Sequence, residues 1–99
     1  MQRRKLIYVS GPITGIDNYR EKFLQACEKL RSDLYNPVDP SMLGEMFHED
    51  TKHSEYMKVA LALLQVCDEI YMLEGWENSK GASAELAFAQ AVKMPIRFQ

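Results

Sequence analysis

The stretch that most constrains the fold is Gly75-Trp76-Glu77-Asn78-Ser79-Lys80-Gly81-Ala82-Ser83-Ala84-Glu85. The apolar run at residues 70–73 before it predicts a buried strand, and the alanine-rich residues that continue to Lys93 predict a helix. The quoted stretch is therefore a strand-to-helix turn. Ligands bind at such turns in open α/β sheets.

Three residues of this turn have the chemistry of a polar-ligand site. Ser79 and the amide of Gly81 would lie at the first helical turn, where unpaired N–H groups and the helix dipole favour a hydroxyl or a phosphate. Glu85 would follow one turn later, where it could act as a nucleophile or a base. An acidic residue near a helix start also stabilises the helix by about 0.3–1 kcal/mol, so a structural role for Glu85 stays open.

A second strand-to-helix turn lies near the start of the sequence. The β-rich residues Lys5–Ser10 precede Gly11-Pro12-Ile13-Thr14-Gly15, and a helical pattern follows. If the two strands are parallel neighbours, both turns lie at one sheet edge, where Tyr8 would meet Ser79 and Glu85. The structural alternatives are ordinary turn chemistry for the glycines and an ordinary core position for Tyr8.

The other elements extend this α/β pattern. We predict a helix capped by Asp17 or Asn18, a short extended element at 35–40, a helix at 53–66 and a last strand at 95–98. Four strands alternating with helices predict a flavodoxin-like or Rossmann-like sandwich, with a small parallel sheet and helices on both faces. The apolar stripe of the first helix is Phe23, Ala26, Cys27, Leu30 and Leu34.

Residues 41–50 are expected to form a loop or a single helical turn, which could be a lid. Met42, Met46 and Phe47 would then form the apolar side of a base pocket, or would simply cover the core under the loop.

Composition predicts a single domain over residues 1–99. The 99 residues are 46% hydrophobic, and their formal net charge of -2 gives no general attraction to a nucleic acid polymer or to an anionic membrane. Arg3, Arg4 and Lys5 form a small basic cluster that we interpret as a solvated entry to the first strand. Without a secretory signal or an apolar run of membrane length, a cytoplasmic protein is the expectation.

Cysteine and histidine spacing predicts no metal site and no disulfide. Cys27 and Cys67 lie in no Cys-x-x-Cys motif, so both are expected to be reduced and buried. His48 and His53 are five residues apart, which misaligns them on a helix, and a third clear ligand is absent. No cofactor is expected.

Four motifs together point to a family. They are Tyr8-Val-Ser-Gly-Pro-Ile-Thr-Gly15, Asn36-Pro37, Cys67-Asp68-Glu-Ile-Tyr-Met-Leu73, and Gly75-Trp-Glu-Asn-Ser79-Lys-Gly-Ala82 with Glu85. In this order they resemble the small phage and bacterial proteins of the nucleoside 2-deoxyribosyltransferase superfamily, in particular the DUF4406 group. More distantly, the chain is similar to the 2'-deoxynucleoside 5'-phosphate N-hydrolases.

The resemblance implies an enzyme that cleaves or transfers the N-glycosidic bond of a 2'-deoxynucleoside or its 5'-monophosphate. Glu85 would attack C1' of the sugar and form a glycosyl ester, Tyr8 would orient Glu85, and Ser79 would hold the 5' end or its phosphate. Relatives complete their pockets with a neighbour's residues, so a homodimer or a higher homo-oligomer is expected. The substrate-binding residues implied in this way are Ser10, Gly11, Pro12, Thr14, Gly15, Asn36, Ala60, Trp76, Ser79 and Gly81.

Two positions depart from the family pattern. Ala60 stands where relatives carry an aspartate that assists the leaving group, so Asp68, Glu77 or Asp39 would have to supply the second carboxylate. Thr14 stands where the nucleotide hydrolases carry a phosphate-binding arginine. A non-catalytic nucleotide-binding sensor or sponge on the same fold is therefore the alternative function.

Asp68 and Trp76 each have two interpretations. Asp68 is counted among the catalytic candidates with Glu85 and Tyr8, and it equally fits a structural role at a turn near the sheet. Trp76 could stack on a nucleobase, which is worth about 1–3 kcal/mol per base in nucleic-acid binders, or it could cover the loop or a subunit interface.

Overall fold

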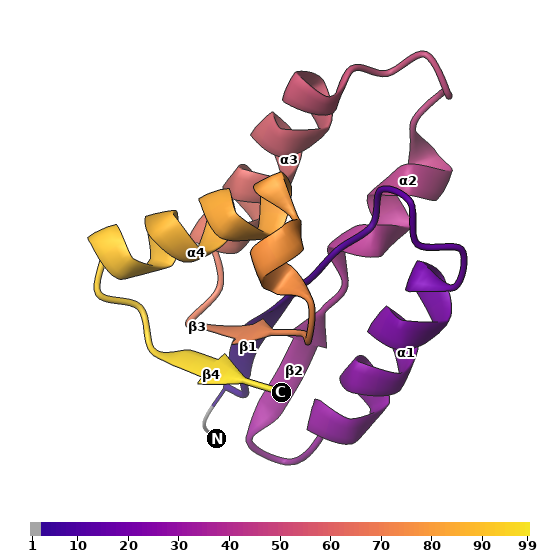
Figure 1. Ribbon diagram of the computed structural model, residues 1–99. Coiled ribbons are helices and arrows are strands. Elements are labelled where there is room, and N and C mark those ends of the chain that lie inside the picture. The colour runs from indigo at the N-terminus through magenta and orange to yellow at the C-terminus, as the bar shows by residue number, and fades with distance from the viewer. Residues whose placement is uncertain (1–2) are drawn as a thin grey trace.

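The computed structural model describes residues 3–99, and its centre is a sheet of four parallel strands (Figure 1). In chain order the elements are β1 (Lys5–Ser10), α1 (Tyr19–Leu30), β2 (Tyr35–Val38), the 3-10 turn η1 (Pro40–Met42), α2 (Leu43–Met46), α3 (His53–Gln65), β3 (Glu69–Met72), the 3-10 turn η2 (Trp76–Asn78), α4 (Lys80–Ala91) and β4 (Ile96–Phe98). The strand order β2-β1-β3-β4 follows the flavodoxin-like pattern. The predicted fold class is confirmed.

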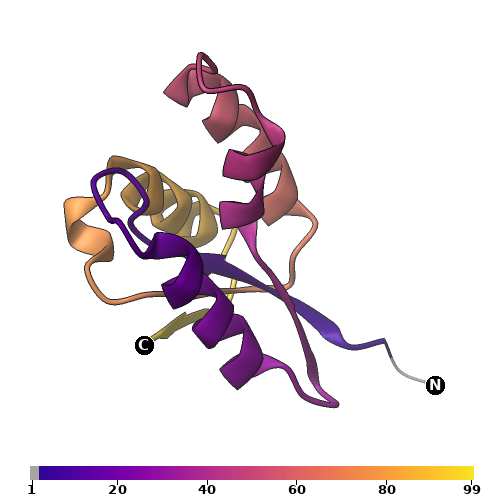
Figure 2. The same cartoon turned by 90° about the vertical axis from the view of Figure 1, so that its right-hand side faces the viewer.

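Helices cover both faces of this sheet. Figure 2 shows α1 on one side and α4 on the other. On the α1 side, Val9 packs with Phe23, Ala26, Cys27 and Leu73. On the other side, residues of α3 and α4 pack on the sheet, and this cluster contains Tyr8, Leu64, Cys67, Ile70, Met72, Ala82, Leu86 and Ala89. Burial on both faces explains why β1 is apolar along most of its length rather than alternating.

The two strand-to-helix turns lie at the same edge of the sheet. β1 and β3 are parallel neighbours, and Ser10 lies opposite Met72 in their register. The carboxyl ends of both strands therefore coincide. β3 begins and ends one residue earlier than the sequence pattern predicts. Gly75 has a φ of 88°, which a residue with a side chain rarely adopts, and it turns the chain toward α4.

The first helix differs from the prediction at both ends. Asn18 is the N-cap of α1, but its side chain makes no capping hydrogen bond. The helix ends at Leu30, because Arg31 adopts an extended conformation. Leu34 thus falls in the following loop and is 71% exposed, so its assignment to the buried stripe was wrong.

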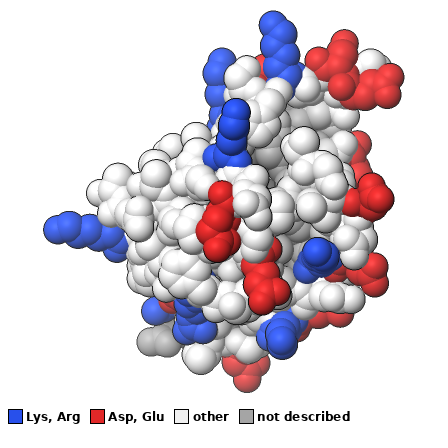
Figure 3. All heavy atoms as spheres, viewed as in Figure 1, with Lys and Arg blue, Asp and Glu red and all other residues white. Residues whose placement is uncertain are grey.

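The basic cluster at the chain start lies at the opposite sheet edge, and two of its three residues pair with acidic side chains. Arg3 contacts Asp68 at 3.2 Å, and Lys5 contacts Glu69 at 3.6 Å. On the face shown in Figure 3, basic and acidic side chains are interspersed. Among residues 3–99, no helix is both long enough and apolar enough to cross a membrane.

Candidate active site

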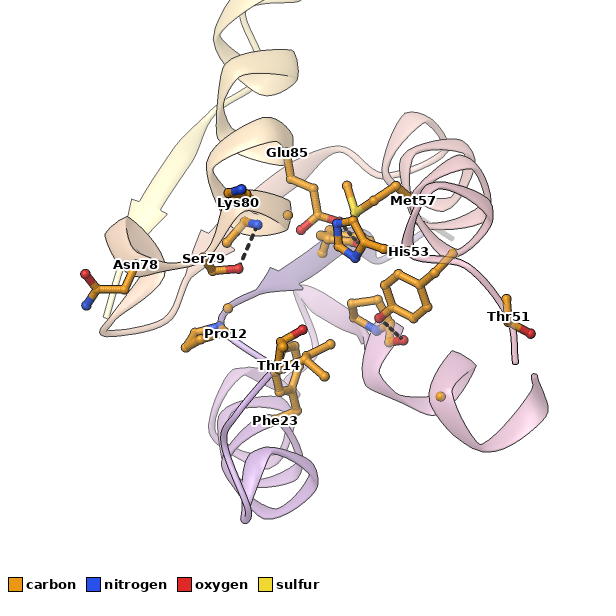
Figure 4. A pocket seen from close by; sticks show the side chains of 18 residues that line it. Pro12, Thr14, Phe23, Thr51, His53, Met57, Asn78, Ser79, Lys80 and Glu85 are labelled. Carbon is orange, nitrogen blue, oxygen red and sulfur yellow. Dashed lines mark hydrogen bonds between the residues drawn. The ribbon is translucent and has the colours of Figure 1, made fainter. Parts of the chain in front are cut away.

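A pocket of about 670 Å³ opens at the carboxyl ends of β1 and β3 (Figure 4). One wall comes from α3 and another from the first turns of α4, while the loop after β1 and residues around α2 complete it. Its volume lies in the usual range of small-molecule sites, about 300–1,000 Å³. The lining residues are Tyr8, Gly11, Pro12, Ile13, Thr14, Phe23, Pro40, Gly44, Thr51, His53, Tyr56, Met57, Asn78, Ser79, Lys80, Gly81, Ala82 and Glu85.

Glu85 is the carboxylate of this pocket, and two hydroxyl groups hold it. The residue is only 6% exposed. The Tyr8 hydroxyl donates to Oε2 of Glu85, and Ser10 Oγ donates to Oε1 at 2.6 Å. Both donors come from β1, so the carboxylate of α4 is fixed against the central strand. Such fixation leaves Glu85 a single orientation relative to a ligand.

Burial and hydrogen bonding act in opposite directions on the acidity of Glu85. Burial raises its pKa above the ordinary value, while the hydrogen bonds from Ser10 and Tyr8 lower it. Burial, with the neighbouring Glu85 charge as a smaller cause, raises the pKa of Tyr8 well above its ordinary value. The Tyr8 hydroxyl therefore keeps its proton and acts as a donor to Glu85.

The start of α4 forms the second polar part of the pocket. Ser79 Oγ accepts a hydrogen bond from the Ala82 amide at 3.1 Å and so caps the helix. The Ser79 hydroxyl can still donate its own proton to a ligand oxygen. The backbone of Gly81 lies close to α3. A Cβ placed on it would be 3.2 Å from Met57 Sδ and 3.7 Å from His53 Cε1.

The wall around η1 and α2 is held by Arg20 and Tyr56. Arg20 donates to Ser41 Oγ at 2.8 Å and pairs with Glu45 at 3.2 Å. The Tyr56 hydroxyl donates to the Pro40 carbonyl at 3.0 Å. These contacts join α1, α2 and α3 around the pocket mouth.

Several residues expected at the site are brought together, and others are not. Tyr8, Gly11, Pro12, Thr14, Ser79, Gly81 and Glu85 line the pocket, and Ser10 contacts Glu85. Gly15, Asn36, Ala60, Asp68 and Trp76 do not line it. Gly15 and Asn36 are exposed, and Ala60 is fully buried within the α3 packing.

Asp68 lies at the opposite edge of the sheet. It precedes β3, and its carboxylate accepts a hydrogen bond from the Leu6 amide at 2.7 Å and pairs with Arg3. Leu6 is near the start of β1, whereas the pocket lies beyond its end. Asp68 therefore has the structural role that was its second interpretation, and its assignment as a catalytic residue is corrected.

Trp76 lines a separate, smaller hollow of about 210 Å³. Its ring packs against Phe98, with centroids 6.1 Å apart. Stacking on a nucleobase inside the larger pocket would need this packing to be broken.

The expected apolar base pocket has a different composition. Met42 and Met46 are 57% and 73% exposed and lie outside the lining. Phe47 packs edge-on against Tyr56. The apolar side of the pocket is instead formed by Met57, Phe23 and the ring of Tyr56.

Sequence reasoning missed the pocket face of α3. His53, Tyr56 and Met57 line the pocket, and they follow i, i+3, i+4 spacing. This spacing places them on one side of a helix, so it was the available signal. Lys80 and Asn78 were also missed.

The described residues offer no group of three or more His, Cys, Asp or Glu side chains placed to hold a metal ion. His48 pairs with Asp50 at 2.8 Å on the surface, away from His53. Cys27 and Cys67 are free and buried, and burial raises the pKa of each thiol to about 11.

Fold and pocket together define an α/β protein with a pocket of small-molecule size at the carboxyl edge of a parallel sheet. Residues 5–98 match the family described as Domain of unknown function (DUF4406), and the chain belongs to this family. No curated protein matches the sequence.

Among solved structures, the chain is similar to the 2-desoxiribosyltransferase from Leishmania mexicana, with a TM-score of 0.70 and 19% sequence identity. The alignment covers 95% of this chain and 63% of that chain, so the chain spans less than two thirds of that protein. At this identity the likeness establishes the deoxyribosyltransferase-like fold.

Proposed function

We propose that the protein cleaves or transfers the N-glycosidic bond of a 2'-deoxynucleoside or its 5'-monophosphate. The observation that carries this proposal is Glu85, a buried carboxylate that lies in a pocket of suitable volume and is fixed by two hydroxyl donors. The similarity in fold to a deoxyribosyltransferase supports the same reaction class.

Glu85 would act as the nucleophile. Its carboxylate attacks C1' of the sugar, the C1'–N bond breaks, and a glycosyl ester forms on the side chain. Attack by water on C1' then releases the sugar, while attack by a second base transfers it. Tyr8 and Ser10 would hold the carboxylate in line for both steps, because both contact it from the fixed strand β1.

The sugar would lie between the loop after β1 and the start of α4. Pro12 and Thr14 face this space from one side and Ser79 from the other (Figure 4). The Ser79 hydroxyl and the first amides of α4 would receive the 5' end of the substrate or its phosphate. The base would then extend toward Met57 and Tyr56 on α3.

A panel of deoxynucleosides and their 5'-monophosphates tests this function. Each is incubated with the protein, with and without a second free base, and base release is followed by chromatography. We expect release that is lost in Glu85→Gln, together with a deoxyribosyl adduct on Glu85 in the intact mass of the wild type. Exchange with the added base would identify a transferase, and release alone a hydrolase. Glu85-independent release, or none, would refute the proposal.

A nucleotide-binding sensor or sponge is the second candidate. It is favoured by one observation, since Glu85 is the single carboxylate among the residues that line the pocket. Tight binding of an unchanged nucleotide by the wild type, measured by calorimetry, would support this candidate instead.

A cytoplasmic location and a homodimer belong to the same proposal. The location is carried over from the expectation based on the sequence, and the homodimer follows from the resemblance to relatives that share their pockets. Light scattering coupled to size-exclusion chromatography tests the homodimer directly.

A further inference from the structure

The pocket holds one carboxylate, whereas glycoside cleavage commonly uses two. Asp68 lies at the opposite sheet edge, and Glu77 lines the smaller hollow beside Trp76. Asp39 accepts hydrogen bonds from Ser41 and pairs with Arg20 at 3.7 Å. None of these three carboxylates lines the pocket, so none replaces the acid missing at Ala60.

A departing nucleobase still needs a proton, because an anionic base is a poor leaving group. The proton donor should be a titratable side chain that lines the pocket. Glu85 is one of these side chains, but the proposed function already uses it as the nucleophile. The hydroxyls of Tyr8 and Tyr56 already donate to Glu85 and to the Pro40 carbonyl. Burial also raises the pKa of Tyr8 and of Tyr56, so both hold their protons more tightly.

Two basic side chains remain, Lys80 and His53. An ammonium group holds its proton far more tightly than an imidazolium does, so a lysine is the weaker acid near neutral pH. Imidazole can both give and take a proton in this range. Chemistry therefore favours His53 as the donor.

The position of His53 fits this role. Its Cε1 lies 3.7 Å from the place of a Cβ on Gly81, and Gly81 is one helical turn before Glu85 on the same side of α4. In Figure 4 the imidazole and the Glu85 carboxylate both point into the pocket, from α3 and α4 respectively. Ala60 is two turns further along α3, on the same side of that helix as His53.

We propose that His53 is the general acid that protonates the leaving nucleobase, in place of the carboxylate absent at Ala60. The inference rests on the proposed function. As Glu85 bonds to C1', the electron pair of the C1'–N bond passes to the base nitrogen, and the imidazolium proton goes to the base. Neutral imidazole then takes a proton from the attacking water, the ester C1'–O bond breaks, and Glu85 regains its electron pair. Water is consumed, and the neutral base and the sugar are released.

Substrates whose leaving group departs without protonation distinguish a general-acid role of His53 from a role in substrate binding. N7-methyl-2'-deoxyguanosine already carries a positive charge, so its base leaves as a neutral molecule, whereas 2'-deoxyguanosine requires protonation. Nitrophenyl 2'-deoxyriboside serves the same purpose if the protein prefers pyrimidines. His53→Gln is compared with wild type, and His48→Gln is the matched control because that histidine lies outside the pocket.

We expect His53→Gln to lower kcat on the unmodified deoxynucleoside by about 10²- to 10⁴-fold, the usual contribution of general acid–base catalysis. Its kcat on the activated substrate should stay close to that of wild type, and His48→Gln should match wild type on both. Equal losses of kcat on both substrates, or no loss on either, would overturn the role of His53. The proposed function would still stand in that case if wild-type turnover depends on Glu85. Absence of wild-type turnover on every substrate would overturn both.

Discussion

Tyr8→Phe is the most direct perturbation of the candidate site, because it deletes one hydroxyl donor and keeps the buried ring. The lost hydrogen bond joins a hydroxyl to a carboxylate, and such charged bonds contribute about 1.5–3 kcal/mol. If the hydrogen bond stabilises only the ionised form of Glu85, its loss raises the proton affinity of Glu85 by a factor of about 10 to 150. The change therefore raises the pKa of Glu85 further, because one of the two hydrogen bonds that lower it is lost.

The pH dependence of stability reports this change without an activity assay. Burial raises the pKa of Glu85 above its ordinary value of 4.5, so the folded protein binds this proton more tightly than the unfolded chain does. The contribution of Glu85 to the free energy of unfolding is thus greatest in acid. It falls as the pH rises from about 4.5 through the folded-state pKa, by at most about 1.4 kcal/mol per pH unit.

Urea unfolding at a series of pH values measures the effect, with Glu85→Gln as the variant that lacks this titration. The free energy of unfolding of wild type, minus that of Glu85→Gln, should decline as the pH rises and then level off. In Tyr8→Phe the decline should continue to a higher pH than in wild type. Ser10→Ala, which removes the 2.6 Å donor to the other carboxylate oxygen, should act in the same direction. A Tyr8→Phe profile that coincides with wild type would refute the reasoning.

Three further substitutions test the surroundings of the site. Gly81→Ala places a methyl 3.2 Å from Met57 Sδ, so nucleotide affinity measured by calorimetry should fall. The melting temperature should hold or rise, because alanine stabilises a helix relative to glycine by up to about 1 kcal/mol. Unchanged affinity would contradict this prediction. Gly11→Ala places a methyl 2.9 Å from Leu73 Cβ, so unfolding should become easier by about 1–3 kcal/mol, and a neutral result would mean that β1 shifts freely. Asp68→Asn weakens the contact with the Leu6 amide and should cost about 1 kcal/mol in urea unfolding with base release unchanged, whereas a large loss of turnover would return Asp68 to the site.

Much of the fold was predictable because its signals are local. An apolar run followed by a glycine-containing turn and an apolar helical stripe occurs twice, at β1–α1 and at β3–α4. Once β1 and β3 are parallel neighbours, as the structure shows, both turns lie at a common edge and Tyr8 and Ser79 approach Glu85. The same rule, applied to Asp68, would have argued against its catalytic assignment, because a residue that precedes a parallel strand lies at the opposite edge.

The other pocket walls were less predictable because they depend on contacts between distant segments. The apolar side chains at 42, 46 and 47 were expected to form one side of a base pocket. The contacts of Arg20 and Tyr56 hold η1 and α2 in an orientation that leaves both methionines facing outward. Trp76 is likewise turned toward Phe98, more than twenty residues later.

The sequence by itself determined the α/β class and the two strand-to-helix turns, since each follows from patterns within a few residues. Only the tertiary structure decided that Tyr8 and Ser10 of β1 contact Glu85, that His53 of α3 faces Gly81 of α4, and that Glu85 is the one carboxylate among the described residues that line the pocket. These features arise where separate helices pack on a shared sheet. The angle and depth of that packing are set by the whole core rather than by any local run of residues.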